Sequence, residues 1–338
     1  MTTTSLLKPA NYQHMVLARR PQTQMQLDDF EVQSLTFKAL PEAQVLIKNH
    51  YLSIDPYMRG RMNQTKSYAA PQALGQTMIG ATVGQVVESN SPEFPVGCWV
   101  SGMGGWSEYS YLPVAGLRLL DVSKVAPSAY LGVAGMPGMT AWYGLKQILQ
   151  ARSDQTLVVT AAAGAVGSVV GQLAKRAGCR VIGIAGGEQK TTYLRQQLGF
   201  DVALDYKAEN FKSAYNSAAE QGIDLVFENV GGAVFDQTLS LLNPFARIAL
   251  CGMIASYDGQ PYAFNNLSAL LSMRAHLQGF IISEHLEYWP QGLRELSELV
   301  ANGELHYQES ISQGLTSAPA ALLGVLNGKN FGKQVVQL

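Results

Sequence analysis

The chain has 338 residues, and 47% of them are hydrophobic, which is enough for two domains of ordinary size, each with a buried core. Its 24 basic and 25 acidic side chains are interspersed and leave a formal net charge of −1, so we expect no nucleic-acid partner and no membrane partner. The N-terminus lacks the apolar segment of a signal peptide, and no run of about 18 apolar residues follows. Three scattered cysteines fit a reducing compartment, so we expect a cytoplasmic protein.

Short β-type runs broken by glycine and proline fill the chain up to about residue 130. Ala43–Lys48 and Thr82–Glu88 are examples, and together such runs predict a β-rich domain. Within this part, Tyr51–Met62 places an apolar strand before Asp–Pro and then a turn that carries Tyr57 and Arg59. A phenol and a guanidinium this close can polarise a carbonyl oxygen, although a packed aromatic ring and a surface charge explain the same pattern.

From about residue 134 the pattern changes to alternating helices and strands. The expected strands are Thr156–Thr160, Arg180–Ala185, Val202–Asp205, Leu225–Glu228 and Arg247–Cys251. Strands spaced in this way predict a doubly wound parallel sheet. The end of the chain, Gly332–Leu338, returns to a strand-like pattern and is expected to rejoin the first domain. The sequence therefore predicts one domain from residues 1–132 and 305–338, and a second from residues 133–304.

The turn after the first of these strands has the pattern of a dinucleotide phosphate site. Gly164 and Gly167 let the backbone approach a pyrophosphate next to the start of a helix. Ala162 replaces the first glycine of the usual G-x-G-x-x-G motif, so the motif is degenerate, and an ordinary turn of small residues is the alternative. The next strand follows after one helix length, as a βαβ unit requires, and this favours the dinucleotide interpretation.

The end of the second strand bears on the choice of cofactor. An acidic residue there would bind the ribose 2′-hydroxyl and repel a 2′-phosphate, but this chain has Gly186 and Gly187. Lys190 follows, and its ammonium group can bind a phosphate dianion, so the sequence favours NADPH over NADH. Glu188 lies near the acidic position, and a solvated lysine at a helix start is the alternative interpretation.

Further ligand contacts are expected where the later strands end, because ligands of open α/β sheets bind outside the carboxyl ends of the strands. Asn229 follows one strand and the loop Cys251–Tyr257 follows the next. Asn229 can hold a ribose or an amide, although a local turn explains it equally well.

Zinc sites are not expected in this sequence. No histidine occurs between His50 and His276, and the three cysteines cannot form the four-cysteine structural site of metal-dependent dehydrogenases. Polarisation of a substrate carbonyl is then expected to come from hydrogen-bond donors.

Several long segments occur in an order that is typical of one protein family. They are YLSIDPYMRGRM, LGVAGMPGMTAWYGL, VVTAAAGAVGSVVGQLAKRAGCRVIGIAGGEQK, LGFDVALDYK, FENVGG and KNFGK. In these segments the chain resembles the zinc-independent medium-chain dehydrogenases/reductases, and within them the prostaglandin, alkenal and curcumin reductases. The resemblance covers essentially the whole chain. It implies an α/β fold in which a Rossmann domain with a doubly wound parallel sheet is joined to a β-rich, GroES-like domain.

The resemblance also implies an activity and a set of cofactor contacts. The activity is NADPH-dependent reduction of a carbon–carbon double bond conjugated to a carbonyl group. The implied cofactor-binding residues are Gly164, Ala165, Val166, Gly167, Gly186, Lys190, Tyr206, Asn229, Cys251, Gly252, Ser256, Tyr257, Phe280, Ile281, Ile282 and Asn330. Ser272 stands where mammalian prostaglandin reductases have a tyrosine near the substrate, so substrate recognition is expected to differ from theirs.

For the catalytic step, hydride transfer to the β-carbon of an enone would gather negative charge on the carbonyl oxygen. The candidate donors to that oxygen are Tyr57, Arg59, Tyr257 and the cofactor ribose, with a tyrosine or water supplying the proton. The alternatives are a quinone oxidoreductase, an allylic-alcohol dehydrogenase or a non-catalytic NADPH-binding protein. The lack of a basic patch and the segment Asp55–Arg59 argue against the last of these.

Two further expectations concern the pocket and the assembly. Apolar residues near the expected pocket indicate a roomy apolar site, although core residues would show the same pattern. They are Met58, Met62, Trp106, Met253, Tyr257 and Phe280. Members of the superfamily commonly join their Rossmann sheets edge to edge, so the resemblance implies a homodimer formed by strands near Leu277–Ile282.

Overall fold

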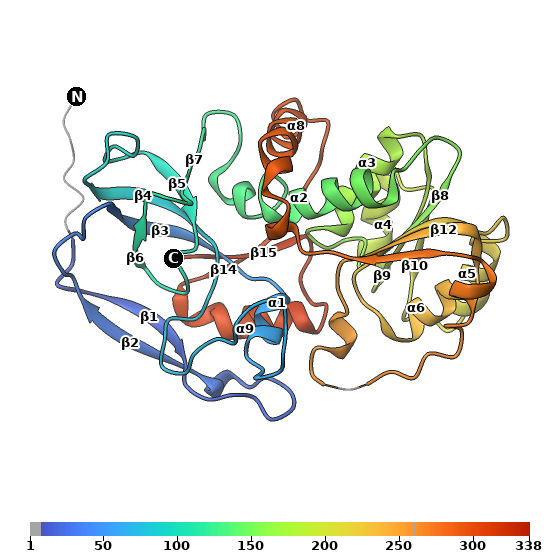
Figure 1. Ribbon diagram of the computed structural model, residues 1–338, viewed down its shortest axis with the longest axis horizontal. Helices are drawn as coiled ribbons and strands as arrows, with labels where there is room; N and C mark the ends of the chain where they lie inside the picture. Colours follow the sequence, from blue (N-terminus) through green and yellow to red (C-terminus); the bar gives the residue numbers. More distant parts are fainter. Residues whose placement is uncertain (1–7, 260) are drawn as a thin grey trace. The chain divides into compact units, whose positions relative to one another are not determined.

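The computed structural model describes residues 8–259 and 261–338, and the chain divides into two units (Figure 1). The α/β unit contains Gly132–Glu309 and Asn330–Lys333. The β-rich unit contains the residues up to Leu131 together with Ser310–Lys329 and Gln334–Leu338. The chain therefore returns to the β-rich unit at Ser310, and the short segment Asn330–Lys333 again belongs to the α/β unit before the last strand.

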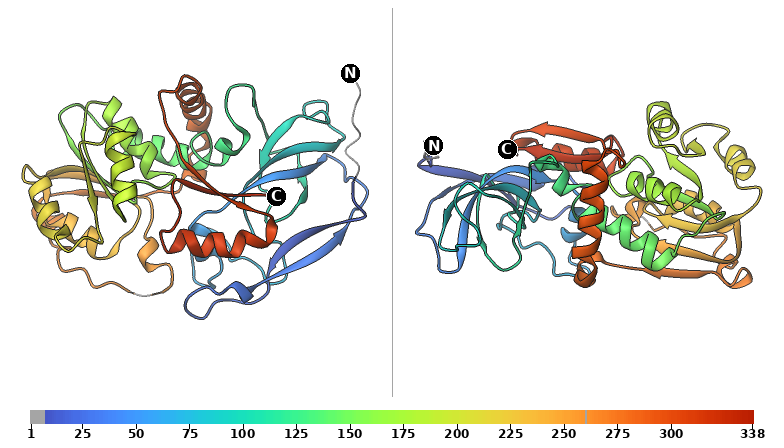
Figure 2. Two further views of the ribbon diagram at one scale, coloured as in Figure 1. Left: turned by 180° about the vertical axis from the view of Figure 1, so that it is seen from behind. Right: turned by 90° about the horizontal axis from the view of Figure 1, so that it is seen from above.

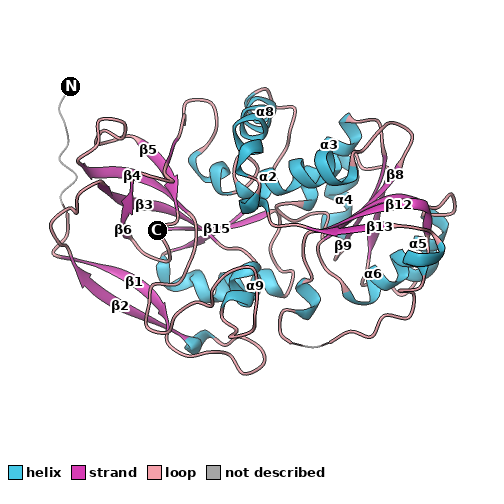
Figure 3. Cartoon of the chain, in the orientation of Figure 1, coloured by secondary structure: helices cyan, strands magenta, loops and turns pink. Residues whose placement is uncertain are grey.

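A six-stranded parallel sheet forms the centre of the α/β unit. In spatial order its strands are β10 (Val202–Asp205), β9 (Arg180–Ala185), β8 (Thr156–Thr160), β11 (Ile223–Glu228), β12 (Leu242–Leu250) and β13 (His276–Gly279). The helices between them are α3 (Gly167–Arg176), α4 (Glu188–Gln196), α5 (Phe211–Ala218) and α6 (Gly232–Leu239). Figures 1 and 3 show α3 and α4 on one face and α5 and α6 on the other. The predicted doubly wound sheet is confirmed, and the strand order reverses between β8 and β11.

Close packing in this unit depends on small residues at two places. Gly171 in α3 and Gly183 in β9 face the ring of Phe200, and a Cβ atom on Gly171 would lie 1.9 Å from that ring. These glycines let the helix approach the sheet with one aromatic ring between them. On the other face, Tyr215 of α5 and Phe235 of α6 are buried against the strands. Both faces of the sheet are covered, which is why its central strands are continuous apolar runs.

The remaining elements of the α/β unit flank this sheet. They are α2 (Met136–Tyr143), which continues as the π-helical segment Gly144–Leu149, α7 (Ala269–Ser272), α8 (Trp289–Ala301) and the 3-10 turns Ile254–Ser256, Ile282–Glu284 and Leu286–Tyr288. Helix α8 packs on α2, where the indole of Trp142 donates a hydrogen bond to Glu295 at 2.9 Å.

The β-rich unit contains a seven-stranded sheet and a separate strand pair. The sheet consists of β14 (Glu309–Gln313), β15 (Lys333–Gln337), β3 (Gln44–Ser53), β4 (Thr82–Ser89), β5 (Trp99–Gly102) and β7 (Arg118–Leu119), with β6 (Tyr109–Pro113) paired to β3. Strands β1 (Asn11–Leu17) and β2 (Phe30–Thr36) form the antiparallel pair, and Figure 2 shows them side by side in both views. The helices are α1 (Tyr57–Arg61), α9 (Ala318–Leu326) and the 3-10 turns Leu27–Asp29, Pro127–Leu131 and Leu315–Ser317.

The end of the chain completes the sheet of the β-rich unit. Val335–Gln337 pair antiparallel with Tyr51–Ser53 of β3. Most of the last strand therefore lies in the β-rich unit, whereas Asn330–Lys333 and the residues up to Glu309 belong to the α/β unit. None of the helices in residues 8–259 and 261–338 combines the length and the apolar character needed to cross a bilayer.

Two expectations for the β-rich unit need correction. Met58, Met62 and Trp106, which were expected near an apolar pocket, are fully buried in the hydrophobic core together with Met15 and Leu322. They pack in the interior of the β-rich unit. The segment predicted as a turn after Asp–Pro is the short helix α1, because Pro56 before it already has helical backbone angles, φ −58° and ψ −32°.

Candidate functional site

The turn between β8 and α3 has the geometry of an anion site. Ala161 adopts a left-handed φ of 48°, and its carbonyl accepts a hydrogen bond from Gly164 at 2.9 Å, which closes the turn. A Cβ atom on Gly167 would lie 2.5 Å from the same carbonyl oxygen, so only glycine fits at the start of α3. The turn formed by Gly164, Ala165, Val166 and Gly167 thus lies directly before the N-terminal end of α3, where free amides favour a phosphate.

A distant segment of the chain lies against this turn. The amide of Gly332 donates a hydrogen bond to the carbonyl of Ala163 at 2.9 Å, and Gly332 pairs with Gly164 in a parallel bridge. The side-chain amide of Asn330 bonds to the carbonyl of Gly332 at 2.7 Å, which fixes this loop. The structure therefore brings Asn330 to the predicted phosphate turn.

Three of the predicted residues, Gly186, Lys190 and Tyr206, lie close together after the carboxyl ends of β9 and β10. A Cβ atom on Gly186 would lie 2.8 Å from the ring of Tyr206, so the glycine makes room for that ring. Lys190 is on the first turn of α4, and burial together with the positive charge of Lys207 lowers the pKa of its ammonium group. Two ammonium groups next to an exposed phenol suit a dianion such as the 2′-phosphate of NADPH. The residues present fit the predicted cofactor.

A second group of predicted residues lies at the ends of β11 and β12. The backbone amide of Asn229 bonds to Oγ1 of Thr160 and its side-chain amide bonds to the carbonyl of Thr160, both at 2.8 Å. The hydroxyl of Tyr257 lies 3.3 Å from where a Cβ atom on Gly252 would be, and that atom would lie 3.0 Å from the carbonyl of Asn229. Asn229, Gly252 and Tyr257 are therefore close neighbours.

The two groups lie on opposite sides of β8 in the sheet, and the strand order reverses between β8 and β11. Dinucleotides bind across such a reversal point. We therefore expect the adenosine half at β9 and β10, where the lysines lie, and the pyrophosphate at the turn after β8. The nicotinamide half is then expected over β11 and β12, near Asn229, Cys251, Gly252, Ser256 and Tyr257.

The predicted residues after β13 have a different environment. The ring of Phe280 is buried against the rings of Tyr143 and Phe227, with centroid distances of 5.7 and 6.2 Å, and Ile282 is buried as well. The side chains of Phe280 and Ile282 therefore pack in the core, and Ile281 lies between them. Ser272 ends α7 and is exposed.

The two candidate donors of the β-rich unit differ in their surroundings. Burial raises the pKa of Tyr57, so its phenol stays protonated, and the charge of Asp55 adds to this shift. Arg59 is 2% exposed and donates hydrogen bonds to Oδ1 of Asn63 and to the carbonyl of Thr23. These bonds favour a structural role for Arg59. Tyr57 and Arg59 belong to the β-rich unit and Tyr257 to the α/β unit, so the structure does not join the three within one unit.

Sequence reasoning missed three residues that the structure places among the predicted ones. Thr160 bonds to Asn229, Lys207 lies near Lys190, and the buried Glu228 bonds to Thr160. Glu228 had a visible signal, because it is a charged residue directly after the apolar run Leu225–Phe227 of β11. Across the described part of the chain, no cluster of three histidine, cysteine, aspartate or glutamate side chains has the arrangement of a metal site.

Comparisons with known proteins agree with this geometry. Residues 13–120 match the family model described as the N-terminal domain of oxidoreductase, and residues 165–298 match the one described as zinc-binding dehydrogenase. The chain is 44% identical to the NADPH-dependent curcumin reductase of Escherichia coli over 330 residues, which cover 96% of both proteins. It is 40% identical to the NADP(+)-dependent 2-alkenal reductase of Nicotiana tabacum, with 92% of each chain covered. The chain belongs to the zinc-independent medium-chain dehydrogenases/reductases.

A solved structure supports the same conclusion. CurA from Vibrio vulnificus, determined in complex with NADPH, superposes on this chain with a TM-score of 0.91 and 44% identity, covering 96% of this chain and 98% of CurA. The predicted membership of this family of oxidoreductases is confirmed.

Proposed function

We propose that this medium-chain reductase uses NADPH to reduce the carbon–carbon double bond of α,β-unsaturated ketones and aldehydes. The cofactor choice rests on the lysine pair at the ends of β9 and β10, where burial and the charge of Lys207 lower the pKa of Lys190. The reaction type rests on the full-length relatives, since curcumin and 2-alkenals both carry a double bond conjugated to a carbonyl group. The observation that carries the proposal is the pair of ammonium groups of Lys190 and Lys207 near Gly186.

The residues of the chain have separate tasks in this reaction. NADPH, when bound, supplies the hydride that the β-carbon of the enone accepts. Lys190 and the turn before α3 hold the phosphates, and Asn229 orients the nicotinamide half. The hydroxyl of Tyr257 donates a hydrogen bond to the carbonyl oxygen as negative charge develops there. Tyr57 is a second donor, because its raised pKa keeps the phenol protonated at neutral pH.

The proposal is tested by following NADPH absorbance with a panel of substrates. The panel contains curcumin, a medium-chain 2-alkenal, a simple enone and a quinone, and an allylic alcohol is assayed with NADP⁺. Turnover of the enones to saturated carbonyl products, with strong preference for NADPH over NADH, is the expected result. Turnover of the quinone alone would replace the proposal with a quinone oxidoreductase, and tight NADPH binding without turnover would indicate a non-catalytic binder.

We also propose that the chain forms a homodimer through the edge of its six-stranded sheet. In the described residues β13 is the outer strand, and apolar side chains near it are exposed, among them Leu277, Leu271 and Phe245. An unpaired edge of this kind favours pairing with a second copy.

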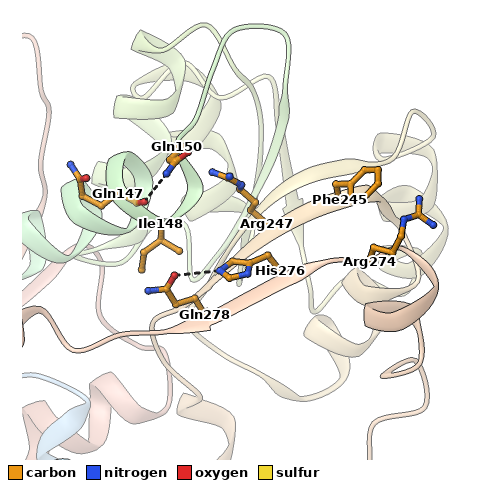
Figure 4. Close-up of a pocket in the computed structure, with 8 residues that line it drawn as sticks. All are labelled: Gln147, Ile148, Gln150, Phe245, Arg247, Arg274, His276 and Gln278. Atoms are coloured by element: carbon orange, nitrogen blue, oxygen red, sulfur yellow. Dashed lines mark hydrogen bonds between the residues drawn. The ribbon is translucent and has the colours of Figure 1, made fainter.

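A cavity of about 350 Å³ also lies beside this edge, and Figure 4 shows its lining. The lining residues are Gln147, Ile148, Gln150, Phe245, Arg247, Arg274, His276 and Gln278. Arg247 of β12 pairs in register with His276, the first residue of β13, away from the strand ends where the dinucleotide site is expected. The cavity therefore belongs to the sheet edge and not to the cofactor site.

Light scattering tests the dimer. We expect a mass of twice 36.5 kDa for the wild type and a monomer for the double variant Leu271→Asp and Leu277→Asp. The control is Leu74→Asp, an exposed leucine of the β-rich unit. A wild-type monomer, or a double variant that remains dimeric, would contradict the proposal.

A cytoplasmic location is the last part of the proposal. Cys98, Cys179 and Cys251 are all free thiols, which fits a reducing compartment. Fractionation of cells that produce a tagged chain tests it, and recovery outside the cytoplasm would contradict it.

A further inference from the structure

Glu228 is a buried carboxyl group at the carboxyl end of the central strand β11. It is 0% exposed, and one of its oxygens, Oε1, accepts three hydrogen bonds. The donors are the hydroxyl of Thr160 at 2.9 Å, the amide of Val230 at 2.6 Å and the amide of Gly231 at 2.7 Å. The other oxygen, Oε2, is buried without a hydrogen-bond partner among the described residues. Burying a carboxyl oxygen without a hydrogen bond costs free energy, so we expect Glu228 to have a function that an apolar residue cannot supply.

The hydrogen bonds of Glu228 connect three neighbouring strands. Thr160 ends β8, and the backbone carbonyl of Glu228 accepts the amides of Cys251 and Gly252, which follow β12. The carboxyl group fixes the orientation of the Thr160 hydroxyl, because that hydroxyl donates to Oε1 and accepts the amide of Asn229 at 2.8 Å. Glu228 and the backbone amide of Asn229 are thus linked through the hydroxyl of Thr160.

We propose that Glu228 is a positioning residue for the nicotinamide half of the cofactor. It acts through Asn229 and the Val230–Gly231 turn and has no part in binding the adenosine half. This inference rests on the proposed use of NADPH. Lys190 and Tyr206 follow β9 and β10, which lie on the other side of β8 from β11 in the sheet.

Among the described residues, a thiol and a phenol are the other ionisable groups that interact with Glu228. Cys251 from the loop after β12 and Tyr215 from α5 both feel its charge, and burial raises the pKa of each group. The thiol and the phenol therefore stay neutral near pH 7. Neither bonds to Oε2, so the role of Glu228 depends on the acceptor atom Oε1.

The test compares two ligands on two variants of the full-length protein. NADPH spans both halves of the site, whereas adenosine 2′,5′-bisphosphate occupies the adenosine half alone. In Glu228→Gln an amide oxygen can still accept the three hydrogen bonds, and in Glu228→Met the acceptor is lost at similar length. Dissociation constants are measured by fluorescence titration without substrate, and melting temperatures are recorded in parallel.

We expect Glu228→Met to weaken NADPH binding at least tenfold and to leave the bisphosphate within threefold of the wild type. Glu228→Gln should bind both ligands within threefold of the wild type. The matched control is Asp236→Asn, which alters another buried carboxyl group of the α/β unit that holds Asn265 and Asn266. It should lower the melting temperature without changing NADPH affinity.

Three results would overturn the proposal: unchanged NADPH binding by folded Glu228→Met, equal weakening of both ligands, or weakening by Glu228→Gln as large as that by Glu228→Met. If Glu228→Met does not fold, Thr160→Val provides the test, because it removes the hydroxyl between Glu228 and Asn229. The same selective loss of NADPH affinity is then expected, and equal affinities for the wild type and Thr160→Val would overturn the proposal.

Discussion

The adenosine and nicotinamide ends of the cofactor site are built in different ways. At the adenosine end, Lys190 and Tyr206 extend from the ends of β9 and β10, and Tyr206 is 45% exposed. At the nicotinamide end, Asn229 is held by Thr160 and by the fully buried Glu228. Charged groups near the surface can select a ligand and can be replaced at little structural cost. A buried network fixes the geometry, and no single residue of it can be replaced without disturbing the others. We therefore expect the adenosine end to act on the affinity for NADPH alone, and the nicotinamide end to act on the rate as well as on that affinity.

The largest effect is expected at the nicotinamide end, for Tyr257→Phe. Removal of the hydroxyl near Gly252 takes away a donor to the developing enolate and should lower kcat on the order of a hundredfold. Steady-state kinetics with an enone measure kcat, and a titration measures the dissociation constant of NADPH, which should change less than about threefold.

Tyr57→Phe provides the comparison in the β-rich unit. If both variants keep the wild-type kcat, the tyrosine donors must be abandoned in favour of the cofactor ribose and solvent. If Tyr257→Phe changes NADPH affinity and not kcat, the division between the two ends is wrong.

The adenosine end is tested by Lys190→Ala. Loss of a charge-assisted contact to the 2′-phosphate should cost about 2 kcal/mol of binding free energy, which is about a thirtyfold higher dissociation constant for NADPH. NADH lacks that phosphate, so its affinity should stay the same. The control is Lys212→Ala, an exposed lysine of α5. Equal losses for NADPH and NADH would show that Lys190 does not read the 2′-phosphate.

The turn between the two ends should affect both cofactors equally. In Gly167→Ala the added Cβ would lie 2.5 Å from the carbonyl of Ala161, so the turn must shift. We expect about a tenfold loss of affinity for NADPH and for NADH alike, from roughly 1–2 kcal/mol of crowding. Gly324→Ala in α9 is the control, because its Cβ would meet nothing closer than 4.0 Å. A loss confined to one cofactor would contradict a shared pyrophosphate turn.

The two ends also differ in how far the sequence predicted them. The strands β8 and β9 were predicted with their observed bounds, because strands buried on both faces are continuous apolar runs. Lys190 and the glycines before α3 can also be recognised from the neighbouring residues of the sequence alone. The edge strand β13 is mostly exposed and lacks such a run, so it was expected only from the family resemblance.

Sequence reasoning was weakest where a residue's role depends on distant parts of the chain. Met58 and Arg59 follow a strand just as ligand-binding residues do, yet Met58 is in the core and Arg59 bonds to the carbonyl of Thr23. Glu228 bonds to Thr160, which is 68 positions away in the chain. Local spacing contains no information about such contacts.

The last prediction concerns protein stability, not cofactor affinity or rate, and it tests the buried network directly. Burial raises the pKa of Glu228 to about 7, although hydrogen bonds from Gly231, Val230 and Thr160 oppose the shift. A raised pKa means that the folded protein holds this proton more tightly than the unfolded chain. The stabilisation is therefore complete below the ordinary pKa of a glutamate and is lost as the pH rises toward and past 7.

Glutamine does not titrate, so the difference in unfolding free energy between the wild type and Glu228→Gln isolates this contribution. We expect the unfolding free energy of the wild type to fall, relative to that of Glu228→Gln, by up to about 3 kcal/mol between pH 5 and pH 8. Urea unfolding at several pH values measures it. A difference that stays constant across this range would mean that Glu228 keeps one protonation state throughout, and the carboxylate would then be stabilised by its three donors despite burial. In that case the nicotinamide end would contain a fixed negative charge, and Glu228→Gln would remove that charge as well as the titration.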